Sequence, residues 1–316
     1  MVMTDQLLTG DGAPSRIVHI TSTPKGGAGK TETADVLEAA LSLTGTRPIL
    51  IDVDDGNRGL TRRIGKEHVV GLNWTSGPED APGWVRRHAA GNGPLIFDLG
   101  AGLMSTDLPI LNFLGSVWRM LHDEGAKIVI YCIVSTNAPT SRFIQQMIST
   151  YGRIAEIMIL RNDQDSSGAF PADIADRSER QLKLDHLAGG IQAVRLLTKA
   201  PLSTVIAEPL PGYGLATKMM AARIYRFARQ LAAASLLDPS GLSVLQAAAA
   251  GGRPVLRKIS RLADASDDRL ARNARLAEAH QALVAGDMDP SVLLAAAEEY
   301  RHAHAAWMKK DSPLNC

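Results

Sequence analysis

The sequence has few of the features that mark a secreted or cysteine-ligated protein. Its two cysteines, Cys132 and Cys316, exclude a disulfide framework, a cysteine-based zinc site and an iron–sulfur cluster with paired ligands from one chain. Cys132 lies in an apolar run and is expected to be buried. Positive and negative side chains nearly cancel, with 34 Lys and Arg against 33 Asp and Glu. Any contact with nucleic acid or an anionic membrane must therefore come from a local patch.

Long apolar runs and a signal peptide are also missing. The longest apolar stretches, such as 128–134, are far shorter than the about 18 residues that a membrane span needs. Residues 1–15 are polar and contain Gly and Pro, without a basic segment followed by an apolar one. We therefore expect no transmembrane segment and a cytoplasmic location.

Short β-branched runs alternate with longer helix-like stretches in most of the 316-residue chain. The strand candidates are continuous apolar runs, which is typical of strands covered on both faces: 16–22, 48–53, 94–98, 127–134, 154–160 and 203–207. The helix candidates are 30–43, 106–123, 138–151, 172–197 and 215–236. This alternation predicts an α/β fold with a mostly parallel sheet flanked by helices. Ligands of such sheets bind at the carboxyl ends of the strands.

The composition indicates three regions. Residues 1–15 are expected to be a flexible N-terminus and 16–237 the α/β domain, with an irregular excursion over 66–93 that contains one short helix near 84–90. From 238 to 316 the chain is rich in Ala and poor in β-branched residues, which predicts an all-helical C-terminal extension.

A glycine-rich segment follows the first predicted strand and directly precedes the first predicted helix. It reads Pro24-Lys25-Gly26-Gly27-Ala28-Gly29-Lys30-Thr31. Glycines let successive backbone N–H groups point at phosphate oxygens, and the helix N-terminus adds partial positive charge. In such a phosphate-binding loop (P-loop), Lys30 contacts the β and γ phosphates and Thr31 supplies a hydroxyl to Mg²⁺.

The additional lysine at Lys25 distinguishes this loop from the general P-loop pattern, which has Gly where this chain has Pro24. The segment resembles the deviant Walker A loop of the ParA/MinD family of partitioning and positioning ATPases. The resemblance covers roughly residues 16 to 235 and implies ATP and Mg²⁺ as cofactors and a homodimer that forms on ATP binding. It also implies that Lys25 reaches the partner subunit's phosphates, where a second cation stabilises transition-state charge.

Acidic residues end the second and third predicted strands. Asp52 and Asp54 lie two residues apart and therefore point to the same side of a strand. The resemblance assigns Asp54 to orienting the attacking water, while Asp52 supports the Mg²⁺ shell or Lys25. The run Leu95-Ile96-Phe97-Asp98 followed by Gly100 has the form of a Walker B strand, whose Asp98 holds Mg²⁺.

The resemblance adds three expectations about the nucleotide site. Asn162 ends a predicted strand where the family carries an asparagine that reads the adenine edge, to which an amide can both donate and accept. Pro209, in the loop 208–212, is expected to wall the base. Glu32 follows Thr31 where the family has a hydroxyl residue near the α-phosphate, so its carboxylate either turns outward or weakens nucleotide binding.

The predicted helix 215–236 carries four basic side chains and no acidic one: Lys218, Arg223, Arg226 and Arg229. They fall on one arc opposite an apolar stripe. This pattern suits either the last helix of the domain with solvated charges or a basic face for non-specific DNA, as in the DNA-binding branch of the family. A second basic segment, 251–275, has the same two interpretations.

The sequence therefore predicts a P-loop ATPase that resembles ParA and MinD: an ATP-dependent dimerising switch, stimulated by an adaptor protein, in DNA or plasmid partitioning, stability or transfer, or in intracellular positioning. Two alternatives stay open. One is a metabolic enzyme of the same fold, such as an ATP-dependent ligase of the dethiobiotin synthetase kind. The other is a nucleotide-bound scaffold with little turnover, because Glu32 or Gly56 impairs hydrolysis.

Overall fold

The computed structural model describes residues 16–53, 57–72, 81–89, 93–100, 108–135, 141–175 and 177–254. The strands in these ranges are β1 (Ile17–Ser22), β2 (Ile49–Asp52), β3 (Val69–Gly71), β4 (Leu95–Asp98), β5 (Lys127–Val134), β6 (Ala155–Asn162) and β7 (Gln181–Leu184). The α-helices are α1 (Lys30–Leu43), α2 (Gly59–Ile64), α3 (Ala81–His88), α4 (Leu108–Asp123), α5 (Ser141–Tyr151), α6 (Ala172–Ala175), α7 (Gly189–Leu196), α8 (Leu202–Ala207), α9 (Gly214–Ala233) and α10 (Leu242–Ala249). Two short 3-10 helices are η1 (Lys66–His68) and η2 (Pro239–Gly241).

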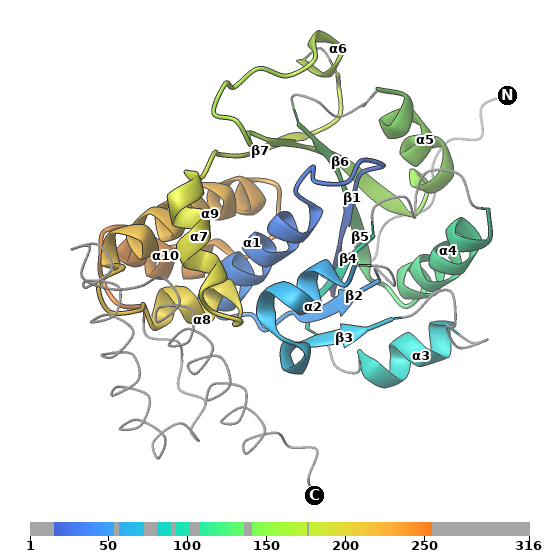
Figure 1. Cartoon of the computed structure of the whole chain (residues 1–316). Helices are drawn as coiled ribbons and strands as arrows, with labels where there is room; N and C mark the ends of the chain where they lie inside the picture. The colour runs from blue at the N-terminus through green and yellow to red at the C-terminus, as the bar shows by residue number, and fades with distance from the viewer. Residues whose placement is uncertain are drawn as a thin grey trace, which may run out of the picture.

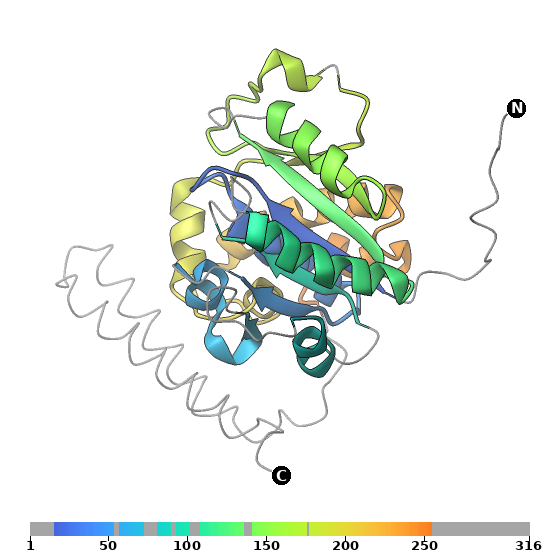
Figure 2. The ribbon, with the colours of Figure 1, turned by 90° about the vertical axis from the view of Figure 1, so that its right-hand side faces the viewer.

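The strands form one seven-stranded sheet in the order β3-β2-β4-β1-β5-β6-β7. Every neighbouring pair is parallel, which confirms the predicted α/β class. Helices α3, α4 and α5 lie on one side of the sheet, and α1, α2, α8, α9 and α10 lie on the other (Figure 1). Figure 2 turns the side with α4 and α5 toward the viewer, so that both helices lie in front of the strands.

Two hydrophobic clusters hold these layers together, one on each face of the sheet. In β4, Ile96 packs into the cluster with α1 and α9, whereas its neighbours Leu95 and Phe97 pack into the cluster with α4 and α5. Successive strand residues point to opposite faces, so a strand covered on both sides must be apolar throughout. This explains why the strands appear in the sequence as continuous apolar runs.

The sheet register brings the predicted site residues to a common edge. Asp98 of β4 is paired with Thr21 of β1 on one side and with Asp52 of β2 on the other. All three residues therefore lie at the carboxyl ends of adjacent parallel strands. The loop that follows β1 leads directly into α1 over this edge.

Two predicted elements differ from the structure. The segment 203–207, expected to be a strand, belongs to helix α8. The segment 172–197, expected to be one helix, contains α6, β7 and α7, because residues 181–184 pair with β6 as the last strand of the sheet. In its described parts, the excursion 66–93 contains the short helix α3, as expected, and also η1 and the edge strand β3.

The described beginning of the predicted C-terminal extension packs on the α/β domain. Leu245 and Ala248 of α10 are buried in the same hydrophobic cluster as Phe227 and Leu231 of α9. Residues 255–316 lie outside the described part of the chain. Among the described helices, none combines the length and the apolar character that crossing a bilayer takes.

Candidate functional site

The glycine-rich loop curls over the end of the sheet with two residues in the left-handed region. Gly27 has φ 75° and Gly29 has φ 100°, a conformation that side chains with a Cβ rarely adopt. A Cβ on Gly29 would also lie 2.0 Å from Nδ2 of Asn162. Glycine at this position is therefore required both by the backbone conformation and by the close approach of β6.

The two loop lysines occupy different environments. Lys30, the first residue of α1, is only 8% exposed, and its Nζ lies 3.4 Å from the carbonyl oxygen of Lys25. Lys25 and the adjacent Gly26 are exposed on the loop. One lysine thus lies inside the loop at the N-terminus of α1, while the other is accessible from outside.

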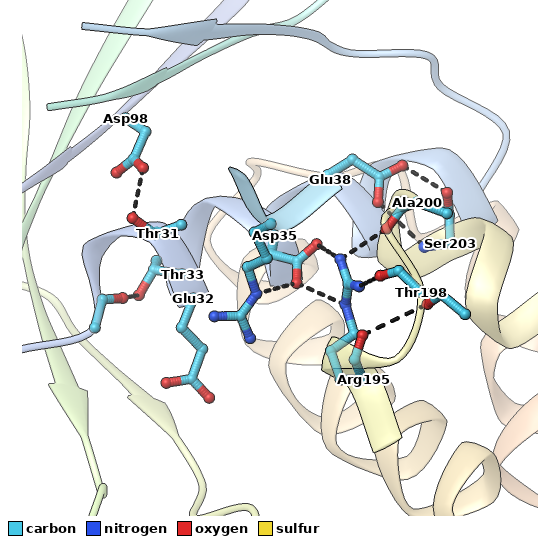
Figure 3. Close-up of polar contacts among 12 residues, drawn as sticks. Thr31, Glu32, Thr33, Asp35, Glu38, Asp98, Arg195, Thr198, Ala200 and Ser203 are labelled. Carbon is cyan, nitrogen blue, oxygen red and sulfur yellow. Dashed lines mark hydrogen bonds and ion pairs between the residues drawn. The ribbon is translucent and has the colours of Figure 1, made fainter. Parts of the chain in front are cut away.

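Asp98 and Thr31 meet at the edge of the sheet. Oγ1 of Thr31 donates a hydrogen bond of 2.7 Å to Oδ2 of Asp98 (Figure 3), and Oγ1 of Thr21 donates one of 3.0 Å to Oδ1. Burial, opposed by the Thr31 hydrogen bond and reinforced by the charge of Asp52, raises the pKa of Asp98 from 3.8 to about 7. The carboxyl group is thus a buried acid held by two hydroxyls, in a place where a nearby positive charge would favour its ionised form.

Asp52 is fully buried beside Asp98 and is held by the following helix. Its Oδ2 accepts hydrogen bonds from the backbone N–H of Thr61 at 2.9 Å and from Oγ1 of Thr61 at 2.7 Å. Nη1 of Arg58 binds the backbone carbonyl of Asp52 at 2.8 Å. These contacts fix α2 against the end of β2. Asp54, the residue expected to orient the attacking water, lies outside the described residues.

Two amide side chains at the end of β6 donate hydrogen bonds to backbone carbonyls of the loop. Nδ2 of Asn162 donates to the carbonyl of Ala28 at 3.1 Å, and Nε2 of Gln164 donates to the carbonyl of Gly27 at 2.9 Å. Oδ1 of Asn162 is buried without a hydrogen-bond partner among the described residues. Asn162 is therefore placed directly under the loop with an unused acceptor. Sequence analysis missed Gln164. Its position two residues after Asn162 was the only local indication that it reaches the same loop.

The remaining predicted site residues take different positions. Pro209 follows helix α8 rather than a sixth strand and lies in the segment between α8 and α9. Glu32 is paired with Arg223, which is only 4% exposed. Arg223 therefore does not belong to an exposed basic face, contrary to the prediction. The other three members of the predicted basic face are exposed: Lys218, Arg226 and Arg229. Arg226 forms an ion pair with Asp185, and the guanidinium of Arg229 lies 5.9 Å from the ring centroid of Tyr225.

A buried polar cluster on α1, one to two turns beyond the loop, was also missed by sequence analysis. Asp35 accepts from Nη2 of Arg195 at 2.9 Å, from Nε of Arg195 at 3.0 Å and from Nε of Arg63 at 2.9 Å (Figure 3). These two guanidinium groups outweigh the effect of burial and hold the pKa of Asp35 below its ordinary value. The cluster joins α1 to α2, which carries Arg63, and to α7, which carries Arg195.

These features define the class of the fold. A seven-stranded parallel sheet with β1 at its centre, a glycine-rich loop between β1 and α1, and acids at the ends of β2 and β4 together form the α/β architecture of a P-loop fold. The predicted fold is thereby confirmed.

Comparison with known proteins finds similar solved structures. One is a chain of the MinC:MinD cell division protein complex of Aquifex aeolicus, at 17% identity and TM-score 0.44, over 69% of this chain and 96% of that one. Another is a nucleotide-binding protein in complex with ADP from Archaeoglobus fulgidus, at 16% identity and TM-score 0.41, over 58% of this chain and 88% of that one. A third is chloroplast FtsY from Physcomitrella patens, at 15% identity and TM-score 0.35, over 51% of this chain and 54% of that one. The chain thus spans about half of that FtsY structure. No protein-family model and no curated protein matches this sequence.

Proposed function

We propose that this protein binds ATP with Mg²⁺ at the carboxyl edge of the sheet and hydrolyses it. The observation that carries this proposal is the 2.7 Å contact between Thr31 and Asp98, directly beneath a loop of the phosphate-binding kind. A hydroxyl and a carboxylate are the oxygen donors that Mg²⁺ prefers. The raised pKa of Asp98 and its proximity to Asp52 supply a reason for a cation to bind there, because positive charge relieves the repulsion between the two acids.

Each residue of the site has a distinct part in this proposal. Thr31 and Asp98 hold the metal, with Asp52 supporting them, and the N–H groups of the loop bind phosphate oxygens. Lys30 places its ammonium at the β and γ phosphates, and Asp54 orients the attacking water. When bound, Mg²⁺ offsets the negative charge that the phosphates develop. The unused Oδ1 of Asn162 accepts from the adenine amino group.

The exposed position of Lys25 supports a switch that acts through dimerisation. Lys25 is exposed on the loop, which places it where a second copy of the chain can bring its own nucleotide phosphates. ATP then favours the dimer, and hydrolysis, accelerated by an adaptor protein, returns the monomer. We place this switch in DNA or plasmid partitioning or in intracellular positioning, with the exposed Lys218, Arg226 and Arg229 as the candidate DNA contacts.

Calorimetry and size-exclusion chromatography test this proposal. We expect Mg²⁺-dependent ATP binding to the full-length protein, and its loss in Lys30→Ala. The ATP-dependent dimer is expected to disappear in Lys25→Ala and to persist in Asp54→Ala, which binds but does not turn over. Lys199→Ala, which removes an exposed lysine between α7 and α8, serves as the matched control and should behave like the parent.

Three outcomes decide between the proposal and its alternatives. A parent protein that takes up no ATP in the presence of Mg²⁺ refutes the nucleotide site. Turnover that depends on a small acceptor molecule indicates the ligase. Tight ATP binding without phosphate release, even with DNA and cell extract, indicates the scaffold.

A further inference from the structure

Glu32 places a carboxylate in the first turn of α1, next to Thr31. The structure pairs it with a distant residue: Oε1 of Glu32 lies 2.7 Å from Nη1 of Arg223 on α9. The Glu32 side chain is 12% exposed and that of Arg223 is 4% exposed, so both charges are largely removed from water. In Figure 3 the Glu32 carboxylate points away from the Thr31–Asp98 pair.

Arg223 is itself held in place. Its Nε donates to the backbone carbonyl of Asp185, which follows β7. A guanidinium group that binds a carboxylate and a carbonyl at once has a fixed orientation, because its donors are arranged in a rigid fork. The position of the Glu32 carboxylate is therefore set by α9 and by the end of β7.

The charge of Glu32 matters because of where it lies. A carboxylate in the first turn is stabilised by the same helix N-terminus that attracts phosphates. Unpaired, it repels a triphosphate at short range, and low exposure weakens the screening of that repulsion. A paired carboxylate contributes little net charge to the site.

We propose that Arg223 is a positioning residue of the nucleotide site: it turns the Glu32 carboxylate away from the phosphates and cancels its charge, so that the P-loop keeps its affinity for a triphosphate. This inference rests on the proposed nucleotide site and extends it to a residue outside the loop. The role of Arg223 is thus internal to the site rather than a contact with DNA.

The test compares four full-length proteins by calorimetry with Mg·ATP and with AMP: the parent, Glu32→Gln, Arg223→Gln and the double variant. Arg223→Gln should bind ATP about tenfold more weakly, the scale of one partly screened charge interaction, with a smaller loss for AMP. The double variant should bind ATP like the parent, because the unpaired carboxylate is gone. Glu32→Gln should bind ATP at least as tightly as the parent.

A matched control breaks a different ion pair. Arg86→Gln removes the exposed pair that Nη2 of Arg86 forms with Glu124 at 2.7 Å, and it should leave ATP affinity unchanged. Thermal unfolding of each variant without nucleotide separates loss of folding from loss of binding.

Several results would overturn the inference. If Arg223→Gln folds and binds ATP like the parent, the charge of Glu32 does not reach the phosphates. If the double variant binds ATP about tenfold more weakly than the parent, or if Glu32→Gln itself weakens binding about tenfold, Arg223 does not act by neutralising Glu32. The last two results decide the matter even if Arg223→Gln does not fold. A parent that binds no ATP refutes the proposed function instead.

Discussion

Glu38 on α1 offers a direct test of the electrostatics of the core. Its carboxyl group is 4% exposed and accepts hydrogen bonds from the backbone N–H of Ser203 at 3.1 Å, from Oγ of Ser203 at 2.6 Å and from Oγ of Ser42 at 2.8 Å. Burial outweighs these hydrogen bonds, and the negative charge of Asp35 adds to its effect. The pKa of Glu38 is therefore raised from 4.5 to about 7.

The sign of the pH dependence follows from this pKa. Between about pH 4.5 and 7 the unfolded chain has lost the proton of Glu38 while the folded protein still keeps it. The stability that this group contributes is thus complete at pH values below 4.5 and is lost as the pH rises through 7. Glu38→Gln keeps a neutral group with an oxygen that can accept from Ser203, so it lacks this loss.

The magnitude follows from the same shift. A rise from 4.5 to about 7 corresponds to about 3 kcal/mol, of which about 2 to 3 kcal/mol falls between pH 5 and pH 8. Urea unfolding of the parent and of Glu38→Gln at pH 5, 6, 7 and 8 measures it, because groups common to both proteins cancel in the difference. We expect the free energy of unfolding of the variant to rise relative to the parent by that amount as the pH increases.

The control is Glu124→Gln, which replaces a carboxylate that is 44% exposed and is unfolded by urea at the same four pH values. The reasoning is refuted if the difference between Glu38→Gln and the parent is flat over this range, or if the variant loses stability relative to the parent as the pH rises.

Two further predictions concern the loop and the buried ion pair. Gly29→Ala should destabilise the protein well beyond Gly27→Ala, because a Cβ on Gly29 meets Asn162 at 2.0 Å whereas one on Gly27 meets nothing within 4 Å. Thermal unfolding of both variants checks this, and equal losses of stability would contradict it. Arg195→Met should lower the free energy of unfolding by about 3 to 5 kcal/mol, since it removes the bidentate partner of the buried Asp35; urea unfolding measures it, and a loss below about 1 kcal/mol would show that the pair is not strongly coupled.

Much of the sheet and its functional edge could be predicted from local sequence. β1 and β4 are apolar runs that end in polar residues, and the P-loop directly links β1 to α1. Such signals are contained within a few neighbouring residues. The contact of Thr31 with Asp98 then follows because β1, which leads through the loop into α1, and β4 are adjacent parallel strands that end at the same edge.

The elements that could not be predicted depend on contacts between distant parts of the chain. The β-branched run in 203–207 favours a strand, yet Glu38 binds the N–H and hydroxyl of Ser203 from 165 residues away and stabilises the first turn of α8. In the same way, Asp35 and Arg195 are 160 residues apart, so nothing local indicates their ion pair. The burial of Arg223 likewise depends on its pairing with Glu32.

The bonds from Asn162 and Gln164 to two consecutive carbonyls of the loop have a consequence for how a ligand would be received. A glycine-rich segment has many conformations open to it, and confining them costs conformational entropy. Because Asn162 and Gln164 bind the loop in the folded protein, this entropy cost is incurred during folding and not when a ligand binds. The loop is therefore preorganised before any ligand binds.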